Sequence, residues 1–191
     1  LDLINKIQQE ELDEVITDNE YIYTVINRSN HELFSSKKLR LYSDNMLALY
    51  KQYDISKEIN NALSRKVWLK CGGYIIIEPT EAMTVIDVNS GKYVSRKEGT
   101  DANEETYFTV NIQAAVEIAR QLRIRNVSGI IMVDFINMNN QTHVDELISI
   151  LKKELKTDPV TASVIDITKL GLVEITRKRT GSPLKDSIIT Q

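Results

Sequence analysis

The side chains of this chain that could do chemistry begin with Asp87 and Asn89, which close an apolar run. The segment from Thr84 to Gly91 reads Thr-Val-Ile-Asp-Val-Asn-Ser-Gly. Because side chains alternate across a strand, Asp87 and Asn89 are expected on the same face. Two oxygen donors at this spacing, beside a glycine-containing turn, suit a hard divalent cation or another polar ligand. The other explanation of the same residues is an Asp-x-Asn that only caps a turn.

A second carboxylate, Asp134, ends a second apolar run. Residues 130–133 read Ile-Ile-Met-Val, and Asp134 follows Asp87 by 47 residues, which leaves room for one strand–helix–strand connection. If the two strands are parallel neighbours, both acids lie at the edge where open α/β sheets bind ligands. Two acids at one place repel each other unless a cation, a proton or a basic side chain intervenes. Mg²⁺ is the expected cation for a phosphate-ester substrate, and an ion pair with lysine or arginine is the alternative.

Basic residues and histidines give weaker indications. Lys169 and the run Arg177-Lys178-Arg179 could contact phosphates, although a solvated strand end explains the same charges. His31 and His143 have no His or Cys at metal-ligand spacing. Both histidines are therefore expected to be surface residues.

Composition excludes several classes of protein. The 191 residues are 42% hydrophobic and 27% charged, with 7 Gly and 3 Pro, which is within the globular range. No stretch of 18 uncharged apolar residues predicts a membrane span, and no signal peptide opens the chain. A net charge of −3 argues against a uniformly basic nucleic-acid coat. The single cysteine, Cys71, excludes an internal disulfide and a Cys-rich zinc site within the chain and fits a reducing, cytoplasmic setting.

The strands and helices that would position these residues follow from hydrophobic periodicity. Strands are expected at residues 15–17, 39–42, 67–69, 74–77, 82–88, 128–135, 161–167 and 171–176. Helices are expected at residues 1–14, 20–28, 45–52, 56–65, 102–124 and 139–156. Residues 183–191 are expected to be a frayed tail or a linker. The predicted fold class is α/β (α+β), a mixed sheet flanked by helices in two subdomains, with a boundary near residues 66–73.

Two helix starts have recognisable capping residues. Asp18 or Asn19 is expected to cap the helix over residues 20–28. Asp101 and Glu104 have the spacing of a loose capping box for the helix over residues 102–124.

Several ordered blocks of sequence resemble a known family. The blocks are residues 72–90 (GGYIIIEPTEAMTVIDVNS), 111–125 (NIQAAVEIARQLRIR), 129–138 (GIIMVDFINM) and 170–179 (LGLVEITRKR). In this order they resemble the catalytic domain of the ribonuclease E/G family. Phe34-Ser35-Ser36-Lys37 and Leu41-Tyr42 resemble the segment that precedes it. The similarity covers nearly the whole chain and is densest from 72 to 179.

The resemblance implies a fold for each part of the chain. It implies a ribonuclease-H-like subdomain over residues 1–70 and a deoxyribonuclease-I-like catalytic subdomain over residues 71–180. Residues 181–191 would be a tail or linker.

The resemblance also implies an activity. Asp87 and Asp134 would hold a catalytic Mg²⁺, or Mn²⁺, with Asn89 as a ligand or a positioning residue. The chain would be the core of a Mg²⁺-dependent endoribonuclease in RNA processing and decay. It would cleave single-stranded A/U-rich RNA to leave 5′-phosphate and 3′-hydroxyl ends. Lys169, Arg177 and Arg179 are the expected contacts to the RNA.

The sequence departs from the family pattern in several places. The upstream RNA-binding and 5′-end-sensing segments are not in the chain, and neither is the Cys-Pro-x-Cys zinc link expected beyond Arg179. Zinc is therefore not expected within this chain, and a homo-oligomer is an expectation for the full-length protein. Asn137 stands where many relatives have an acid. Two other functions remain open: a non-catalytic RNA-binding or scaffold module of the same fold, and a different metal-dependent phosphoesterase.

Overall fold

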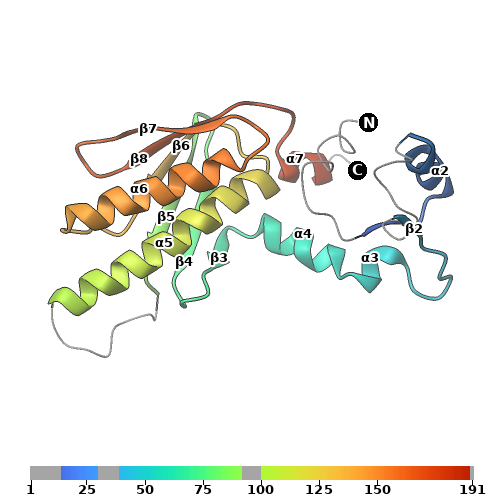
Figure 1. Cartoon of the computed structure of the whole chain (residues 1–191), viewed down its shortest axis with the longest axis horizontal. Helices are drawn as coiled ribbons and strands as arrows, with labels where there is room; N and C mark the ends of the chain where they lie inside the picture. The colour runs from blue at the N-terminus through green and yellow to red at the C-terminus, as the bar shows by residue number, and fades with distance from the viewer. Residues whose placement is uncertain (1–13, 30–38, 92–99, 190–191) are drawn as a thin grey trace. The chain divides into compact units, whose positions relative to one another are not determined.

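The chain divides into two compact units, Leu1–Ile59 and Asn60–Gln191. The computed structural model describes residues 14–29, 39–91 and 100–189, and Figure 1 labels most of their helices and strands. The helix predicted over residues 1–14, the histidine His31 and the motif at residues 34–37 lie outside the described residues. The two subdomain identities stay predictions.

The smaller unit contains two short strands and the helix between them. Its elements are β1 (Val15–Thr17), α2 (Glu20–Ser29), β2 (Leu39–Leu41) and α3 (Leu49–Gln52), while α4 (Ile55–Leu63) runs across the division. β1 and β2 pair in parallel. Asn19 caps α2 as expected, because its Oδ1 accepts a hydrogen bond from the backbone N–H of Ile22 over 3.0 Å. Arg40 donates a hydrogen bond to Glu14 and thereby lowers the pKa of that carboxyl.

The larger unit is built on a mixed sheet, which confirms the predicted fold class. Among the described residues the sheet has six strands in the order β3-β4-β5-β6-β8-β7. Their bounds are β3 Lys66–Trp68, β4 Tyr74–Pro79, β5 Met83–Asn89, β6 Gly129–Asp134, β7 Ala162–Ile167 and β8 Val173–Arg177. Within this described sheet β5 and β6 pair in parallel, and the long helix between them makes that direction possible. Short turns join the antiparallel pairs β3–β4, β4–β5 and β7–β8, and β8 also pairs antiparallel with β6.

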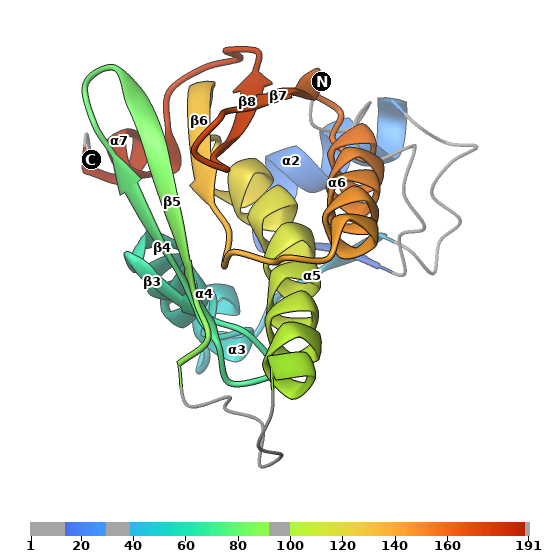
Figure 2. The same ribbon diagram turned by 90° about the vertical axis from the view of Figure 1, so that its left-hand side faces the viewer.

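Two long helices cover one face of this sheet. They are α5 (Thr100–Ile124) and α6 (Gln141–Lys156), which lie side by side in Figure 2. The core between helices and sheet is apolar and includes Ile75, Ile86, Ile118, Ile131, Leu151 and Ile175, all fully buried. On the other face, Met83, Val85 and Ile130 are 36%, 38% and 50% exposed. We call this second face the open face; its residues on β5 and β6 are Met83, Val85, Asp87, Asn89, Ile130, Met132 and Asp134.

Helix α6 begins at Gln141, two residues after its predicted start, and the predicted capping box at α5 is wrong. Asn140 caps α6 by accepting a hydrogen bond from the N–H of Thr142 over 3.0 Å. Glu104 lies within α5, after its start at Thr100, so it does not cap that helix. Its carboxylate instead accepts hydrogen bonds from the N–H groups of Asn139 and Asn140.

The end of the chain is more ordered than a frayed tail. Residues Leu184–Ile189 form helix α7. The backbone N–H of Leu184 donates to the carbonyl of Arg125 over 2.9 Å, and Asn126 Nδ2 donates to the carbonyl of Ser182 over 3.0 Å. These bonds attach the segment to the loop between α5 and β6. Of the helices that the structure describes, none combines the length and apolarity needed to cross a bilayer.

Candidate functional site

Asp87 and Asp134 lie directly opposite each other on the two parallel strands. The register of β5 and β6 pairs Asp87 with Asp134 at the carboxyl end of both strands. Both residues are exposed on the open face, because the alternate residues Ile86 and Val133 are fully buried beneath the helices. Neighbouring strands are about 4.8 Å apart, so the two carboxylates belong to one site. The spacing of the two acids in the sequence predicted that they would lie side by side.

Asn89 is tied to the first of these acids. Its side-chain Nδ2 donates a hydrogen bond to Oδ2 of Asp87 over 2.7 Å. One oxygen of Asp87 is thereby oriented by an uncharged donor, while the carboxylate stays exposed. The structure thus brings together the three residues that the sequence assigned to the candidate site.

The end of β5 is held by close backbone contacts to the turn between β3 and β4. Gly91 has φ +60°, and a Cβ there would lie 2.5 Å from the carbonyl oxygen of Gly72. A Cβ on Gly73 would lie 2.9 Å from the carbonyl oxygen of Asn89 and 3.0 Å from Cγ1 of Val110. Both positions therefore require glycine. The absence of a side chain lets the turn approach the end of β5, which carries Asn89, and lets Gly73 approach α5.

The segment that follows Asp134 is held by Asn111, a residue that sequence reasoning missed. Asn111 lies on α5 and is fully buried. Its Nδ2 donates to the carbonyl of Ile136 over 2.8 Å, and its Oδ1 accepts from the N–H of the same residue over 3.0 Å. The signal in the sequence is helical spacing, because Asn111 shares a stripe with the buried residues Ala115 and Ile118.

Glu104 and His143 support the same loop from the helices. The N–H groups of Asn140 and Asn139 lower the pKa of Glu104, because they stabilise its charged form. His143 Nδ1 lies 3.6 Å from Glu104 Oε1, and the imidazole ring stacks on Phe108 at 4.3 Å between centroids. Its side chain is only 15% exposed, so the expectation of a surface histidine at position 143 is wrong.

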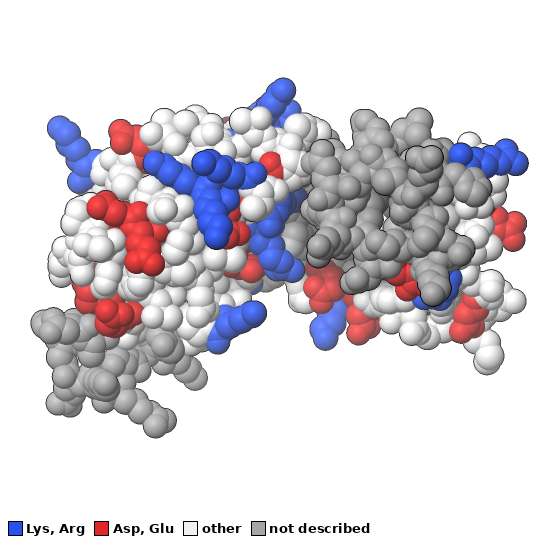
Figure 3. All heavy atoms as spheres, in the orientation of Figure 1, with Lys and Arg blue, Asp and Glu red and all other residues white. Residues whose placement is uncertain are grey.

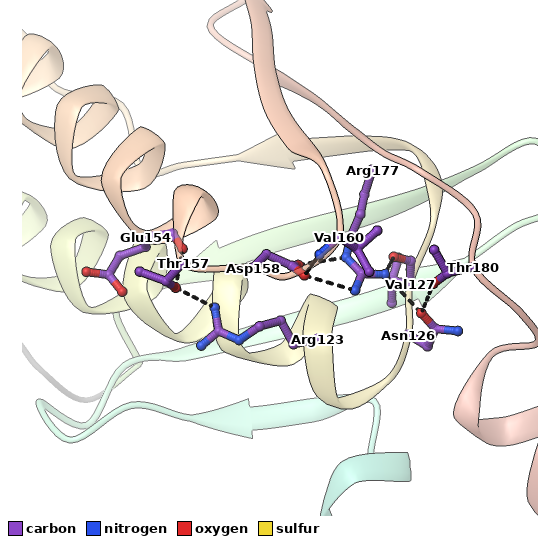
Figure 4. Close-up of polar contacts among 9 residues, drawn as sticks. All are labelled: Arg123, Asn126, Val127, Glu154, Thr157, Asp158, Val160, Arg177 and Thr180. Carbon is purple, nitrogen blue, oxygen red and sulfur yellow. Dashed lines mark hydrogen bonds and ion pairs between the residues drawn. The ribbon is translucent and has the colours of Figure 1, made fainter. Parts of the chain in front are cut away.

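Arg177 is buried and cannot be one of the phosphate contacts that the basic run suggested. Its side chain is 3% exposed, and that of its partner Asp158 is 1% exposed. Nε donates to Asp158 Oδ2 over 2.8 Å, and one terminal nitrogen donates to Asn126 Oδ1 and to the carbonyl of Val127, both over 3.0 Å. Figure 4 shows the guanidinium between these groups. Arg177 therefore joins β8 to the loops that follow α5 and α6.

The other two basic candidates lie at opposite ends of the sheet. Lys169 is exposed in the turn between β7 and β8, which leads into Val173, the partner of Val133. It is thus at the same end as Asp134. Arg179 follows the other end of β8, and a Cβ on Gly129 would lie 3.9 Å from its guanidinium. Of the two, Lys169 is the one at the end of the sheet where the acids lie.

Basic side chains also gather on the helix-covered side of the larger unit. Figure 3 shows Lys and Arg over the C-terminal halves of α5 and α6, where Arg123, Lys153 and Lys156 lie in the last turns. Positive charge there stabilises the helix ends. These charges are on the opposite side of the sheet from Asp87 and Asp134. They are therefore not part of the candidate site.

The donors at the acid pair fit a hard cation. In the parts of the chain that the structure describes, no three His, Cys, Asp or Glu side chains gather as a metal site. Two exposed carboxylates and an amide offer only oxygen ligands of the kind Mg²⁺ and Mn²⁺ take, and Mg²⁺ needs only one or two carboxylates because it keeps its waters. The same set lacks the thiolate or imidazole ligands of a structural zinc site.

Known proteins have sequences similar to that of this chain. The sequence matches the model of the Ribonuclease E/G family over residues 1–180. It is 42% identical over 172 residues to proteins named Ribonuclease G from Salmonella typhimurium and Escherichia coli, covering 89% of this chain and 34% of each relative. It is 44% identical over 138 residues to a protein named Ribonuclease E from Synechocystis sp., covering 72% of this chain and 20% of that relative. The chain spans about a third of the length of the Ribonuclease G relatives it matches.

Proposed function

This chain belongs to the ribonuclease E/G family, and we propose that it is the metal-dependent catalytic core of an endoribonuclease. The observation that carries the proposal is the register pairing of Asp87 with Asp134 on the exposed face of two parallel strands. The names of the relatives support RNA as the substrate. The finer proposal is cleavage of single-stranded, A/U-rich RNA to 5′-phosphate and 3′-hydroxyl ends, in the cytoplasm.

The residues of the proposed site have two roles, metal binding and positioning. Asp87 and Asp134 would hold Mg²⁺, with Mn²⁺ as a substitute. When bound, the cation supplies an acidified water and neutralises charge on the phosphoryl oxygens. Asn89 orients the carboxylate of Asp87, and Lys169 is a basic side chain at the same end of the sheet for a neighbouring phosphate.

A cleavage assay tests this proposal. A 5′-monophosphorylated, A/U-rich RNA oligomer is incubated with the chain, and with the full-length parent, in the presence and absence of Mg²⁺. We expect cleavage that requires Mg²⁺ and that is lost in Asp87→Asn and in Asp134→Asn, each of which keeps the fold. The control is Glu146→Gln, an exposed acid on α6.

Two results would overturn the proposal. RNA binding without Mg²⁺-dependent cleavage, even in the full-length parent, would favour a scaffold module of the same fold. Hydrolysis of nucleotides but not of RNA would favour a phosphoesterase for small substrates.

A further inference from the structure

A partly exposed cluster of two aromatic rings and one cation lies on the open face at the edge formed by β3 and β4. Trp68 is 61% exposed, and its ring meets that of Tyr74 edge to face at 5.3 Å between centroids. Lys66 Nζ lies 3.9 Å from the Trp68 ring centroid and 3.6 Å from that of Tyr74. These contacts hold the ammonium group in place over the two rings.

Strand register connects this cluster to the acid pair. Trp68 pairs with Tyr74, and Tyr74 pairs with Asn89. In the adjacent row, Lys66 pairs with Ile76, Ile76 with Asp87, and Asp87 with Asp134. Partners in register share a face, so both rows lie on the open face at the acid end. Two strand spacings, about 10 Å, separate the backbones of Lys66 and Asp87.

Packing in the apolar core does not account for Trp68. The side chain lies outside the apolar core, which includes its neighbours Val67 and Leu69 instead. A large aromatic side chain left mostly in water at the edge of a polar site is typical of a surface that receives a ligand.

We propose that Trp68 stacks against an unpaired base of the RNA substrate, next to the nucleotide whose phosphate lies at Asp87 and Asp134. Tyr74 supports the Trp68 ring from its edge, and Lys66 contacts the phosphate of the stacked nucleotide. This inference rests on the proposed function and adds to it a base-binding subsite.

The chemistry of the cluster favours single-stranded RNA over a protein segment. Proteins that bind single strands combine aromatic side chains for the bases with basic side chains for the backbone. Lys66 supplies a cation beside the rings, which complements a phosphate. Only an unpaired base offers a free face for stacking, so the cluster also explains a preference for single strands over duplexes.

Fluorescence reports this contact directly, because Trp68 is the single tryptophan of the chain. The experiment titrates the Asp87→Asn chain, which we expect to bind RNA without cleaving it, with a short 5′-monophosphorylated A/U-rich RNA. We expect saturable quenching of Trp68 fluorescence. The same oligomer carrying abasic sites keeps its phosphates, and we expect it to quench little.

Substitutions separate stacking from general loss of apolar surface. We expect Trp68→Ala to weaken RNA binding by about tenfold, as measured with a labelled oligomer, and to raise KM for cleavage far more than it lowers kcat. Trp68→Phe should restore most of the affinity. The matched control is Ile130→Ala, 50% exposed on the open face at the other end of the strands, which should bind RNA normally.

The failure of this inference is distinguishable from failure of the proposed function. If the unsubstituted chain and Trp68→Ala bind and cleave RNA equally well, the subsite alone is overturned. A chain that neither binds nor cleaves RNA overturns both. A change in self-association of Trp68→Ala, with RNA affinity unchanged, would indicate that protein covers Trp68 and would also overturn the subsite.

Discussion

The side-chain amide of Asn89 donates a hydrogen bond to Oδ2 of Asp87 over 2.7 Å. The two residues share a face of β5, so the bond runs along the strand between side chains that point the same way. A carboxylate held by a neighbour loses less freedom when it binds a cation. Asn89 is thus best placed as a residue that orients Asp87, the proposed ligand.

Asn89→Ala is expected to weaken metal binding without unfolding the chain. Loss of a group that orients a metal ligand typically costs ~10–100-fold in affinity or activity. Titration calorimetry with Mn²⁺ and Mg²⁺ measures the effect, and Asn61→Ala, an exposed asparagine on α4, is the control. Equal cation affinity in Asn89→Ala and the parent chain would contradict the positioning role.

Arg177→Met is expected to destabilise the fold by about 3–5 kcal/mol, because it leaves Asp158 buried and unpaired. Urea unfolding measures this loss. Arg179→Met removes an exposed guanidinium two residues later and should change the free energy of unfolding by less than about 0.5 kcal/mol. If Arg177→Met is instead stable but binds RNA poorly, the result would support Arg177 as the phosphate contact that the basic run suggested.

Asn111→Leu is expected to loosen the segment after Asp134. The substitution leaves the buried N–H and carbonyl of Ile136 without their side-chain partner, at a cost of about 1–3 kcal/mol for each group. Hydrogen exchange at the amide of Ile136 should accelerate, and Mg²⁺ affinity should fall because Asp134 ends the adjoining strand. Unchanged exchange at this amide would show that Asn111 does not hold the loop.

Glu104 is expected to make the stability of the loop depend on pH in the acidic range. Hydrogen bonds from Asn140 and Asn139 lower its pKa in the folded chain below 4.5, the ordinary value. The folded state therefore binds the proton less readily than the unfolded state, and stability rises with pH through this range. The carboxylate stabilises the fold above pH 4.5, and this contribution is lost as the pH falls through the lower folded value.

Comparison with Glu104→Gln measures that contribution. The difference in unfolding free energy between the parent chain and Glu104→Gln should be largest at neutral pH and shrink below pH 4.5. Glu105→Gln is the control, because that carboxylate is 72% exposed and lies on the same helix. A difference that is constant from pH 7 to pH 3 would exclude the role of the charge.

The positions of Asp87 and Asp134 were predictable because two simple rules act on them. Alternation along a strand assigns Asp87 and Asn89 to one face, and the length of the connection to Asp134 allows a helix that makes the strands parallel. The mixed sheet and α6 followed from periodicity in the same way. These rules succeed here because the periodicities are local and a single strand–helix–strand connection is enough to place the two acids side by side.

The buried position of Arg177 was missed although the sequence contains a signal for it. Val173, Ile175 and Arg177 alternate along β8, which assigns Arg177 to the core face. A basic run suggests a solvated strand end, and the compensating carboxylate, Asp158, lies in another loop. Only the folded chain brings this partner within reach, so charge alone gave the wrong environment.

Helix α7 and the contacts of Glu104 were missed for a related reason. Both depend on bonds between distant segments, from Leu184 to the carbonyl of Arg125 and from Asn139 and Asn140 to Glu104. A capping box and a frayed tail are the local interpretations of these residues. Tertiary hydrogen bonds override them.

Pairing between Asp87 and Asp134 makes the site sensitive to whether a change in strand length is odd or even. Each step along a strand reverses the side on which a side chain stands. Inserting one residue inside β6, upstream of Asp134, would therefore send that acid toward the helices and bring an isoleucine or valine outward, with both aspartates still in the sequence. Inserting two residues would preserve the sides and displace the acid by one rung of the ladder. We expect length variation in this strand to follow that parity.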